Sequence, residues 1–338
     1  MKRTLTATAL AACAALFAAT AAAAQDYPWK PDRPVTIIVP WAAGGSTDQM
    51  ARIVAAELEA ALKQKFVVVN QPGASGSIGT KNALDAAKDG YTWAAGAAVD
   101  VGTYRVLGLL DTGLPDWKLY FAVANVNVVA VNPNAPFKDF ANFVEALKKD
   151  GDNITVATAG LSSAGHNMME SIRANAAIKY KHVTYNGGAP AVLATVSGET
   201  KAVAQLLVEM SEHIKAKRLI PLAAQSEKPV VLEGYGEIPP VTKWLPKMAA
   251  PLNYFGIWVH KDAPKAVHDT MDAVWKDKIS KSEAIQKYAQ SRAAIFAPLY
   301  GKDAFDESMK MVRYTAWLYH DAGKSKVSPD TVGIPKLQ

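Results

Sequence analysis

The sequence predicts an α/β fold with mostly parallel sheets, divided into two domains. Short apolar, β-branched runs alternate with stretches whose apolar residues recur at helical spacing, which is the pattern of strands joined by helices. Glycine-rich turns separate several of these runs. The chain of 338 residues is also longer than one hydrophobic core usually accommodates, so we expect two domains.

The first predicted strand, residues 35–41, is a short apolar run of the kind that is buried on both faces of a parallel sheet. A Gly-Gly pair ends it, and Ser46 with Gln49 forms a possible capping box for a helix that reaches about residue 62. Strands at 66–70 and 93–96 follow, with a helix over 78–87 between them. The first part of the chain therefore reads strand, helix, strand, helix, strand.

The alternation continues through the second part of the chain. We expect strands over 123–131, 154–159, 182–185, 201–207, 219–224 and 254–259. We expect helices over 137–149, after residue 165, over 190–196, and in three stretches that end near residue 320. Strands and helices in this order again favour an α/β fold.

The first two dozen residues predict a secretory signal peptide, residues 1–24. Lys2 and Arg3 make a positive start, an uncharged Ala/Leu stretch follows, and a small-x-small site ends at Ala24. We expect cleavage after Ala24 and a protein found in the periplasm. The alternative is a lipoprotein box with a lipid on Cys13, which is disfavoured because the run stays apolar beyond Cys13.

Composition excludes several classes of function. Cys13 is the only cysteine, so removal of the signal leaves no thiol for disulfides, metal sites or nucleophiles. The formal charge of +6 minus the charges of Lys2 and Arg3 is +4, and the remaining basic residues are scattered among acidic ones. This argues against nucleic acid as a partner. His166 and Glu170 lie one helical turn apart, but no second histidine joins them, so we expect no metal.

Four turns carry the chemistry that the sequence suggests. Each follows a predicted strand, contains Gly, Ser or Thr, and opens a helix; they span residues 42–48, 74–79, 159–166 and 186–190. Helix N-termini present unpaired N–H groups and a partial positive charge, so such turns can hold an anion without a charged side chain. In parallel α/β sheets, ligands lie beyond the carboxyl ends of the strands, where these turns fall. Simple capping of each helix is the alternative.

Signatures of enzymes are missing from these loops. They lack the Lys-Ser/Thr end of a phosphate loop and the G-x-S-x-G elbow of a hydrolase. Ser163 and His166 are close in sequence, but a local Ser-x-x-His does not by itself indicate a catalytic triad. Asp48 and Arg52, four residues apart, predict a local ion pair. We therefore expect a binding protein, without a cofactor, rather than an enzyme.

At these loops the chain resembles the Bug family, the solute receptors of tripartite tricarboxylate transporters. The resemblance covers the chain after the predicted signal. It rests on Tyr27-Pro28-x-Lys30-Pro31, Ile38-Val39-Pro40-Trp41-Ala42-Ala43-Gly44-Gly45-Ser46-Thr47-Asp48, Asn70-Gln71-Pro72-Gly73-Ala74-Ser75-Gly76, Asp89-Gly90-Tyr91-Thr92, Gly160-x-x-Ser163-x-x-His166 and Tyr185-Asn186-Gly187-Gly188-Ala189-Pro190-Ala191.

The resemblance implies a type II periplasmic-binding-protein fold, in which two α/β lobes are joined by two hinge crossings and close on the ligand. We expect one lobe over residues 27–122 plus 255–338 and the other over 124–253, with the strands at 123–131 and 254–259 as the crossings. The implied ligand is a small carboxylate, held by backbone amides and hydroxyls. The implied partners are membrane transporter subunits, and we expect a monomer.

Carried over by position, the resemblance implies a carboxylate site at the first loop, completed by residues of the second lobe. Trp41 stands directly before the Gly-Gly pair, as a wall of the pocket. The full predicted ligand-binding set is Trp41, Gly45, Ser46, Thr47, Asp48, Ser75, Ser163, His166, Tyr185, Gly188 and Ala189. The family often has Asp where this chain has Lys201, so the role of Lys201, in the pocket or on the surface, stays open.

Two other functions remain as alternatives. A sensory receptor that presents its ligand state to a histidine kinase would share the same fold and pocket. A periplasmic hydrolase would need an activated nucleophile with an oriented base, and the sequence shows none. A transport receptor is the preferred interpretation.

Overall fold

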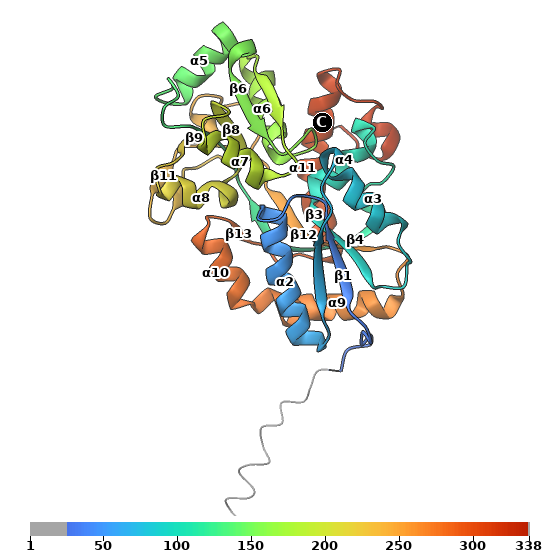
Figure 1. Cartoon of the computed structure of the whole chain (residues 1–338). Helices are drawn as coiled ribbons and strands as arrows, with labels where there is room; N and C mark the ends of the chain where they lie inside the picture. Colours follow the sequence, from blue (N-terminus) through green and yellow to red (C-terminus); the bar gives the residue numbers. More distant parts are fainter. Residues whose placement is uncertain (1–25, 337–338) are drawn as a thin grey trace, which may run out of the picture.

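Two β-sheets, each covered by helices, form the two halves of the molecule (Figure 1). The computed structural model describes residues 26–336, so the predicted signal peptide and Cys13 lie outside the described residues. Within the described part, none of the helices has the length and apolar character needed to cross a membrane. The alternation of strands and helices confirms the predicted α/β class.

The first sheet has six strands in the order β13-β4-β12-β3-β1-β2. Their bounds are β1 (Val35–Val39), β2 (Phe66–Asn70), β3 (Thr92–Ala97), β4 (Trp117–Asn125), β12 (Asn253–His260) and β13 (Ile295–Phe296). Strands β2, β1 and β3 are parallel, whereas β12 runs antiparallel between β3 and β4. The sheet is therefore mixed, and the prediction of mostly parallel strands is wrong for it, because the strand that returns from the other half, β12, runs against both of its neighbours, as β13 does against β4.

Helices cover both faces of this sheet. They are α2 (Ser46–Leu62), α3 (Ser77–Asp85), α4 (Ala98–Leu107), α9 (Lys265–Asp277), α10 (Glu283–Ser291) and α11 (Gly301–Asp321). In α2 the buried residues Met50, Val54 and Leu58 recur at helical spacing and form the stripe that packs on the sheet. Helix α4 was not predicted, because it begins directly after β3 in one continuous run of small and apolar residues.

The second sheet has five strands in the order β7-β6-β8-β5-β9, and a two-stranded hairpin, β10-β11, lies beside it. The strands are β5 (Asn127–Val131), β6 (Thr155–Thr158), β7 (Lys181–Thr184), β8 (Ala202–Leu206), β9 (Ile220–Ala224), β10 (Val230–Leu232) and β11 (Gly236–Ile238). The helices are α5 (Phe140–Asp150), α6 (Ala164–Ala176), α7 (Gly188–Val196) and α8 (Leu207–Lys215). Strands β7, β6 and β8 are parallel, and β5 is antiparallel to both of its neighbours.

Short 3₁₀ helices connect several of these elements. They are η1 (Ala74–Gly76), η2 (Leu114–Asp116), η3 (Gly151–Asn153), η4 (Val241–Lys243), η5 (Ile279–Lys281) and η6 (Pro329–Val332). None was predicted from the sequence as a separate element, since each is only three or four residues long.

The chain passes from the first sheet to the second at one residue. Strand β4 ends at Asn125 and β5 begins at Asn127, so only Val126 separates them. The prediction of one strand over 123–131 is wrong in this respect, because the apolar run continues through the crossing without a turn residue to mark it. The chain returns to the first sheet just before β12.

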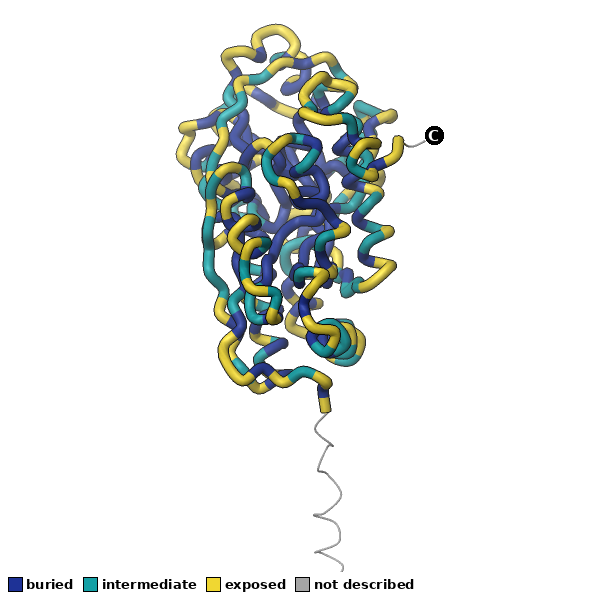
Figure 2. The backbone as a smooth tube through the Cα atoms, turned by 90° about the vertical axis from the view of Figure 1, so that its right-hand side faces the viewer, coloured by how far each residue is buried: buried dark blue, intermediate teal, exposed yellow. Residues whose placement is uncertain are grey.

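The core consists of buried apolar clusters on both faces of each sheet. One cluster joins the two halves: it contains Trp41 and Phe255 from the first half with Leu206 and Ala164 from the second. Figure 2 shows the buried stretches gathered in the interior and the exposed stretches on the outer helices. The two halves therefore meet at an apolar contact that lies beside the loops predicted to bind the ligand.

Candidate ligand-binding site

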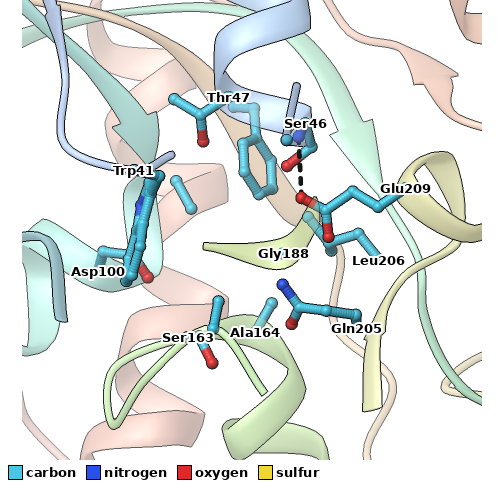
Figure 3. Close-up of a pocket in the computed structure, with 14 residues that line it drawn as sticks. Trp41, Ser46, Thr47, Asp100, Ser163, Ala164, Gly188, Gln205, Leu206 and Glu209 are labelled. Carbon is cyan, nitrogen blue, oxygen red and sulfur yellow. Dashed lines mark hydrogen bonds between the residues drawn. The ribbon is translucent and has the colours of Figure 1, made fainter. Parts of the chain in front are cut away.

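A small cavity lies where the two halves meet (Figure 3). The first half lines it with Trp41, Gly45, Ser46, Thr47, Ala97, Asp100 and Phe255, and the second with Ala159, Ser163, Ala164, Gly188, Gln205, Leu206 and Glu209. The volume open to the centre of a water molecule is about 20 Å³, which is room for about one water. The structure is thus closed around this site.

The loop after β1 is held by the start of α2. The Gly44 N–H donates to Asp48 Oδ2 at 2.9 Å, and Arg52 Nε donates to Asp48 Oδ1 at 3.0 Å, which confirms the predicted ion pair. Burial opposes ionisation of Asp48, but hydrogen bonds from Arg52 and Gly44 outweigh it and lower the pKa of this carboxyl. Asp48 therefore fixes the loop and does not line the cavity.

The predicted capping box of α2 is wrong. The N-cap residue is Gly45, and its helix has no side-chain cap. Gln49 Nε2 instead donates to the Gly44 carbonyl at 2.7 Å. The Ser46 N–H donates at 2.8 Å to a carboxylate of the other half, Glu209 Oε1. A partner that lies 163 residues away in the sequence replaces the local cap, so local pattern could not predict it.

Ser163 is the N-cap of α6. Its hydroxyl donates to the Gly160 carbonyl at 2.7 Å and accepts from the His166 N–H at 3.4 Å. Gly165, the second residue of the helix, lies so close to β8 that a Cβ there would be 1.7 Å from the Ala204 carbonyl oxygen. The glycine thus lets α6 start against β8, which places Ser163 at the cavity.

Glu209 brings a carboxylate to the predicted carboxylate site. It lies in the first turn of α8, and its carboxylate reaches across to α2 (Figure 3). A Cβ added at Gly188 would be 2.0 Å from Glu209 Oε2, and one added at Gly45 would be 3.2 Å from Oε1. The side chain thus lies between the N-termini of α2 and α7, where helix dipoles favour a negative charge.

Asp100 lies on the other side of the cavity, behind the Trp41 ring (Figure 3). Trp41 Nε1 donates to Asp100 Oδ2 at 3.2 Å. Burial raises the pKa of Asp100 to about 8, and the hydrogen bond from Trp41 offsets only part of that effect. Sequence reasoning missed this residue because it did not find α4, and it missed Glu209 because nothing in the local sequence directs α8 toward the first loop.

The structure brings six of the predicted residues to the cavity: Trp41, Gly45, Ser46, Thr47, Ser163 and Gly188. The other five, Asp48, Ser75, His166, Tyr185 and Ala189, do not line it. Ala189 follows Gly188 in α7. A Cβ built on Gly44 would lie 3.9 Å from the Cβ of Ala189. The Tyr185 hydroxyl donates to Glu199 at 2.7 Å. Lys201 is exposed.

Ser75 joins the two halves beside the cavity. Its Oγ accepts from the Leu161 N–H at 2.9 Å, and its carbonyl accepts from Ser162 Oγ at 3.0 Å. The residue adopts a left-handed conformation, with φ of 56°, which costs a non-glycine residue energy. The loop after β2 thus holds the loop after β6 in the closed arrangement.

His166 belongs to a second cluster, outside the cavity, around the buried carboxylate of Glu170. This carboxylate accepts from Arg173 and Lys324 at 2.7 and 2.8 Å and from the Tyr180 hydroxyl at 2.9 Å. His166 Nε2 lies 3.5 Å from it. Burial opposes ionisation of Glu170, but its hydrogen bonds with His166 and Lys324 outweigh burial and hold its pKa far below the usual range.

Helix α11 of the first half contacts this cluster. The Tyr319 hydroxyl donates to Asn167 Oδ1 at 2.6 Å and lies 3.1 Å from His166 Nδ1. His166 Nδ1 also lies 2.8 Å from the Leu161 carbonyl, so the imidazole does not face the Ser163 hydroxyl. The described residues contain no group of three or more side chains suited to a metal ion. The cluster ties the two halves together.

Comparisons with known proteins agree with this architecture. Residues 50–291 match the family model described as the tripartite tricarboxylate transporter family receptor. The protein BugT of Bordetella pertussis is 32% identical over 225 residues, which cover 65% of this chain and 69% of BugT.

Solved structures are similar over most of the chain. A periplasmic transporter is 26% identical with a TM-score of 0.78, over 86% of this chain and 98% of that one. The R. palustris protein Rpa4515 with adipate is 22% identical with a TM-score of 0.78, over 87% and 98%. These likenesses confirm the predicted two-lobed fold.

Proposed function

Because the chain belongs to the family of tripartite tricarboxylate transporter receptors, we propose that it captures a small carboxylate outside the cytoplasm and delivers it to membrane transporter subunits. It is a solute-binding protein and not an enzyme. One observation carries the proposal of a carboxylate. The first residues of α2, α6 and α7, from both halves of the molecule, line a single cavity. Helix N-termini attract anions.

The ligand enters, in this proposal, when the two halves separate. The cavity of about 20 Å³ is too small for a carboxylate, since even one water needs roughly 10–15 Å³. We assign one lobe to residues 27–122 plus 255–338 and the other to 124–253, with the two boundaries moved to residues 126 and 252, because β4 and β12 pair in the first sheet up to Asn125 and from Asn253. The hinge lies at Val126 and at the return of the chain before β12. Adipate, bound by Rpa4515, is a ligand of the proposed class.

Mass spectrometry of the gently purified protein, with a thermal-shift screen of carboxylates, tests the proposed function. We expect a carboxylate to be released on denaturation and the same compound to raise the melting temperature. Gly45→Val should abolish this rise in melting temperature. Even a single Cβ added at Gly45 would lie 3.2 Å from Glu209 Oε1, and the valine methyl groups would extend further into the site. Lys201→Ala, at an exposed position, is the matched control. A protein that neither carries nor responds to any carboxylate would contradict the proposal.

Export is the second part of the proposal. The predicted signal at residues 1–24 directs the chain to the periplasm, and cleavage leaves Gln25 as the first residue. N-terminal sequencing of the exported protein checks this. A modified Cys13 at the N-terminus would indicate a lipoprotein instead.

A further inference from the structure

Three buried oxygen atoms around the cavity have no hydrogen-bond donor. They are Asp100 Oδ1, Gln205 Oε1 and Glu209 Oε2. Asp100 and Gln205 are 6% and 3% exposed. Glu209 is partly exposed as a residue, but its Oε2 atom is buried. Buried polar atoms are normally paired, so three open acceptors in one cavity need an explanation.

No side chain of the cavity supplies a positive charge. Its lining contains two carboxyl groups, and it contains no Lys, Arg or His. Buried carboxylates are normally paired with a cation or a metal, and the described residues form no metal-ligand group. Burial raises the pKa of Asp100 to about 8 and raises that of Glu209 despite its hydrogen bonds with Ser46 and Gln205. Both acids respond as carboxyl groups without a cation do.

A purely structural role does not account for the open oxygens. Asp100 and Glu209 lie in the first turns of α4 and α8, where a helix dipole favours an acidic residue. An interaction with the helix dipole requires only that the acid lie at the helix end. It does not explain why Asp100 Oδ1 and Glu209 Oε2 are buried without hydrogen-bond donors. Glu209 also extends away from its own helix to bind the Ser46 N–H of α2. Both acids are directed at the cavity.

The cavity therefore offers two kinds of surface. The N-termini of α2, α6 and α7 suit a negative group, and the open oxygens suit a group that donates hydrogen bonds. A primary ammonium carries three N–H donors and a positive charge. We propose that the ligand is an aminocarboxylate, whose carboxylate binds the helix N-termini and whose ammonium group is bound by Glu209 with Gln205 or Asp100. This inference rests on the proposed function, since it assumes that the cavity is the ligand site.

Calorimetric titration with matched compounds tests the inference. The probes are small mono-, di- and tricarboxylates, each paired with its amino-substituted counterpart, such as butanoate with 4-aminobutanoate and succinate with aspartate. The unaltered protein should bind an amino-substituted member about 10- to 100-fold more tightly than its plain partner, the range for one hydrogen bond to a charged group. Glu209→Gln should remove that preference. Asp100→Asn is also a nearly isosteric substitution. It provides a second test of the preference if the Glu209→Gln variant does not fold.

Glu212→Gln is the matched control, because Glu212 lies on the same helix, is exposed and pairs with Lys215 at 3.2 Å. It should keep the preference. If plain carboxylates bind as tightly as their amino counterparts, the inference is wrong and the proposed function stands. If no compound of either series binds, the proposed function itself fails. If the preference survives in both Glu209→Gln and Asp100→Asn, the acids do not select the ligand.

Discussion

Ser163 combines two roles in one hydroxyl group, because it caps α6 and also lines the cavity. Ser163→Ala should lower the free energy of unfolding by about 0.5–2 kcal/mol, the usual cost of a lost N-cap. Ser163→Thr keeps the cap but adds a methyl group at a cavity of about 20 Å³, so it should retain stability and weaken ligand binding. Urea unfolding and calorimetry on both variants measure the two effects. Equal stability of the alanine variant and the unaltered protein would contradict the capping role.

Among single residues, the sequence predicted those of the site that belong to strand-to-helix turns. Gly45, Ser46 and Ser163 follow apolar strands directly, and this position leads to the edge of the sheet where the cavity lies. Asp100 and Glu209 could not be predicted in the same way. Each lies in a helix that starts directly after its strand, and no glycine or proline separates the two elements. The sequence therefore shows no turn residue at that point. Their direction depends on tertiary packing.

At the scale of elements, α11 is the helix that links the two halves beyond the cavity. Tyr319 is 2% exposed, and its hydroxyl donates to Asn167 in α6. Tyr319→Phe leaves the Asn167 oxygen without this donor, so we expect the free energy of unfolding to fall by about 1–3 kcal/mol. Tyr235→Phe, at a residue that is 42% exposed, should change it little. Denaturant unfolding compares the variants, and equal losses in both would contradict a specific link.

Most strands and helices were predictable because their apolar periodicity is strong. The stripe of α2, with Met50, Val54 and Leu58, is one example. The crossing at Val126 was not predictable, since the residues on both sides are apolar and β-forming and the change of sheet needs no turn residue. Likewise, the antiparallel pairing of β12 with β3 depends on contacts between residues more than 150 positions apart, which no local pattern records.

At the scale of the whole molecule, the buried acid Asp100 gives stability a dependence on pH. Its folded pKa of about 8 exceeds the unfolded value near 4, so the folded chain holds a proton there that the unfolded chain has lost. Stability from this group is therefore full below about pH 4 and decreases as the pH rises to about 8, by about 1.4 kcal/mol per pH unit.

Asp100→Asn should remove this contribution. Burial lowers the pKa of His182 to about 3, so this residue makes stability rise with pH below about pH 6.5. His182 is present in both proteins, so the difference between their stability profiles reports the contribution of Asp100 alone. Urea unfolding of the ligand-free proteins at pH 5 and at pH 8 gives the measurement. The variant should lose less stability than the unaltered protein over this interval. Parallel profiles would show that Asp100 ionises normally in the folded chain.

The order of strands in the first sheet also affects how the protein is made. Strand β12 lies between β3 and β4. Until residues 253–260 have been synthesised, β3 can therefore pair only with β1, and β4 has no partner in the sheet. Non-local pairing of this kind folds slowly. A ribosome must therefore complete about three quarters of the polypeptide before the sheet closes. We therefore expect the incomplete chain to remain open to the export that we propose for it.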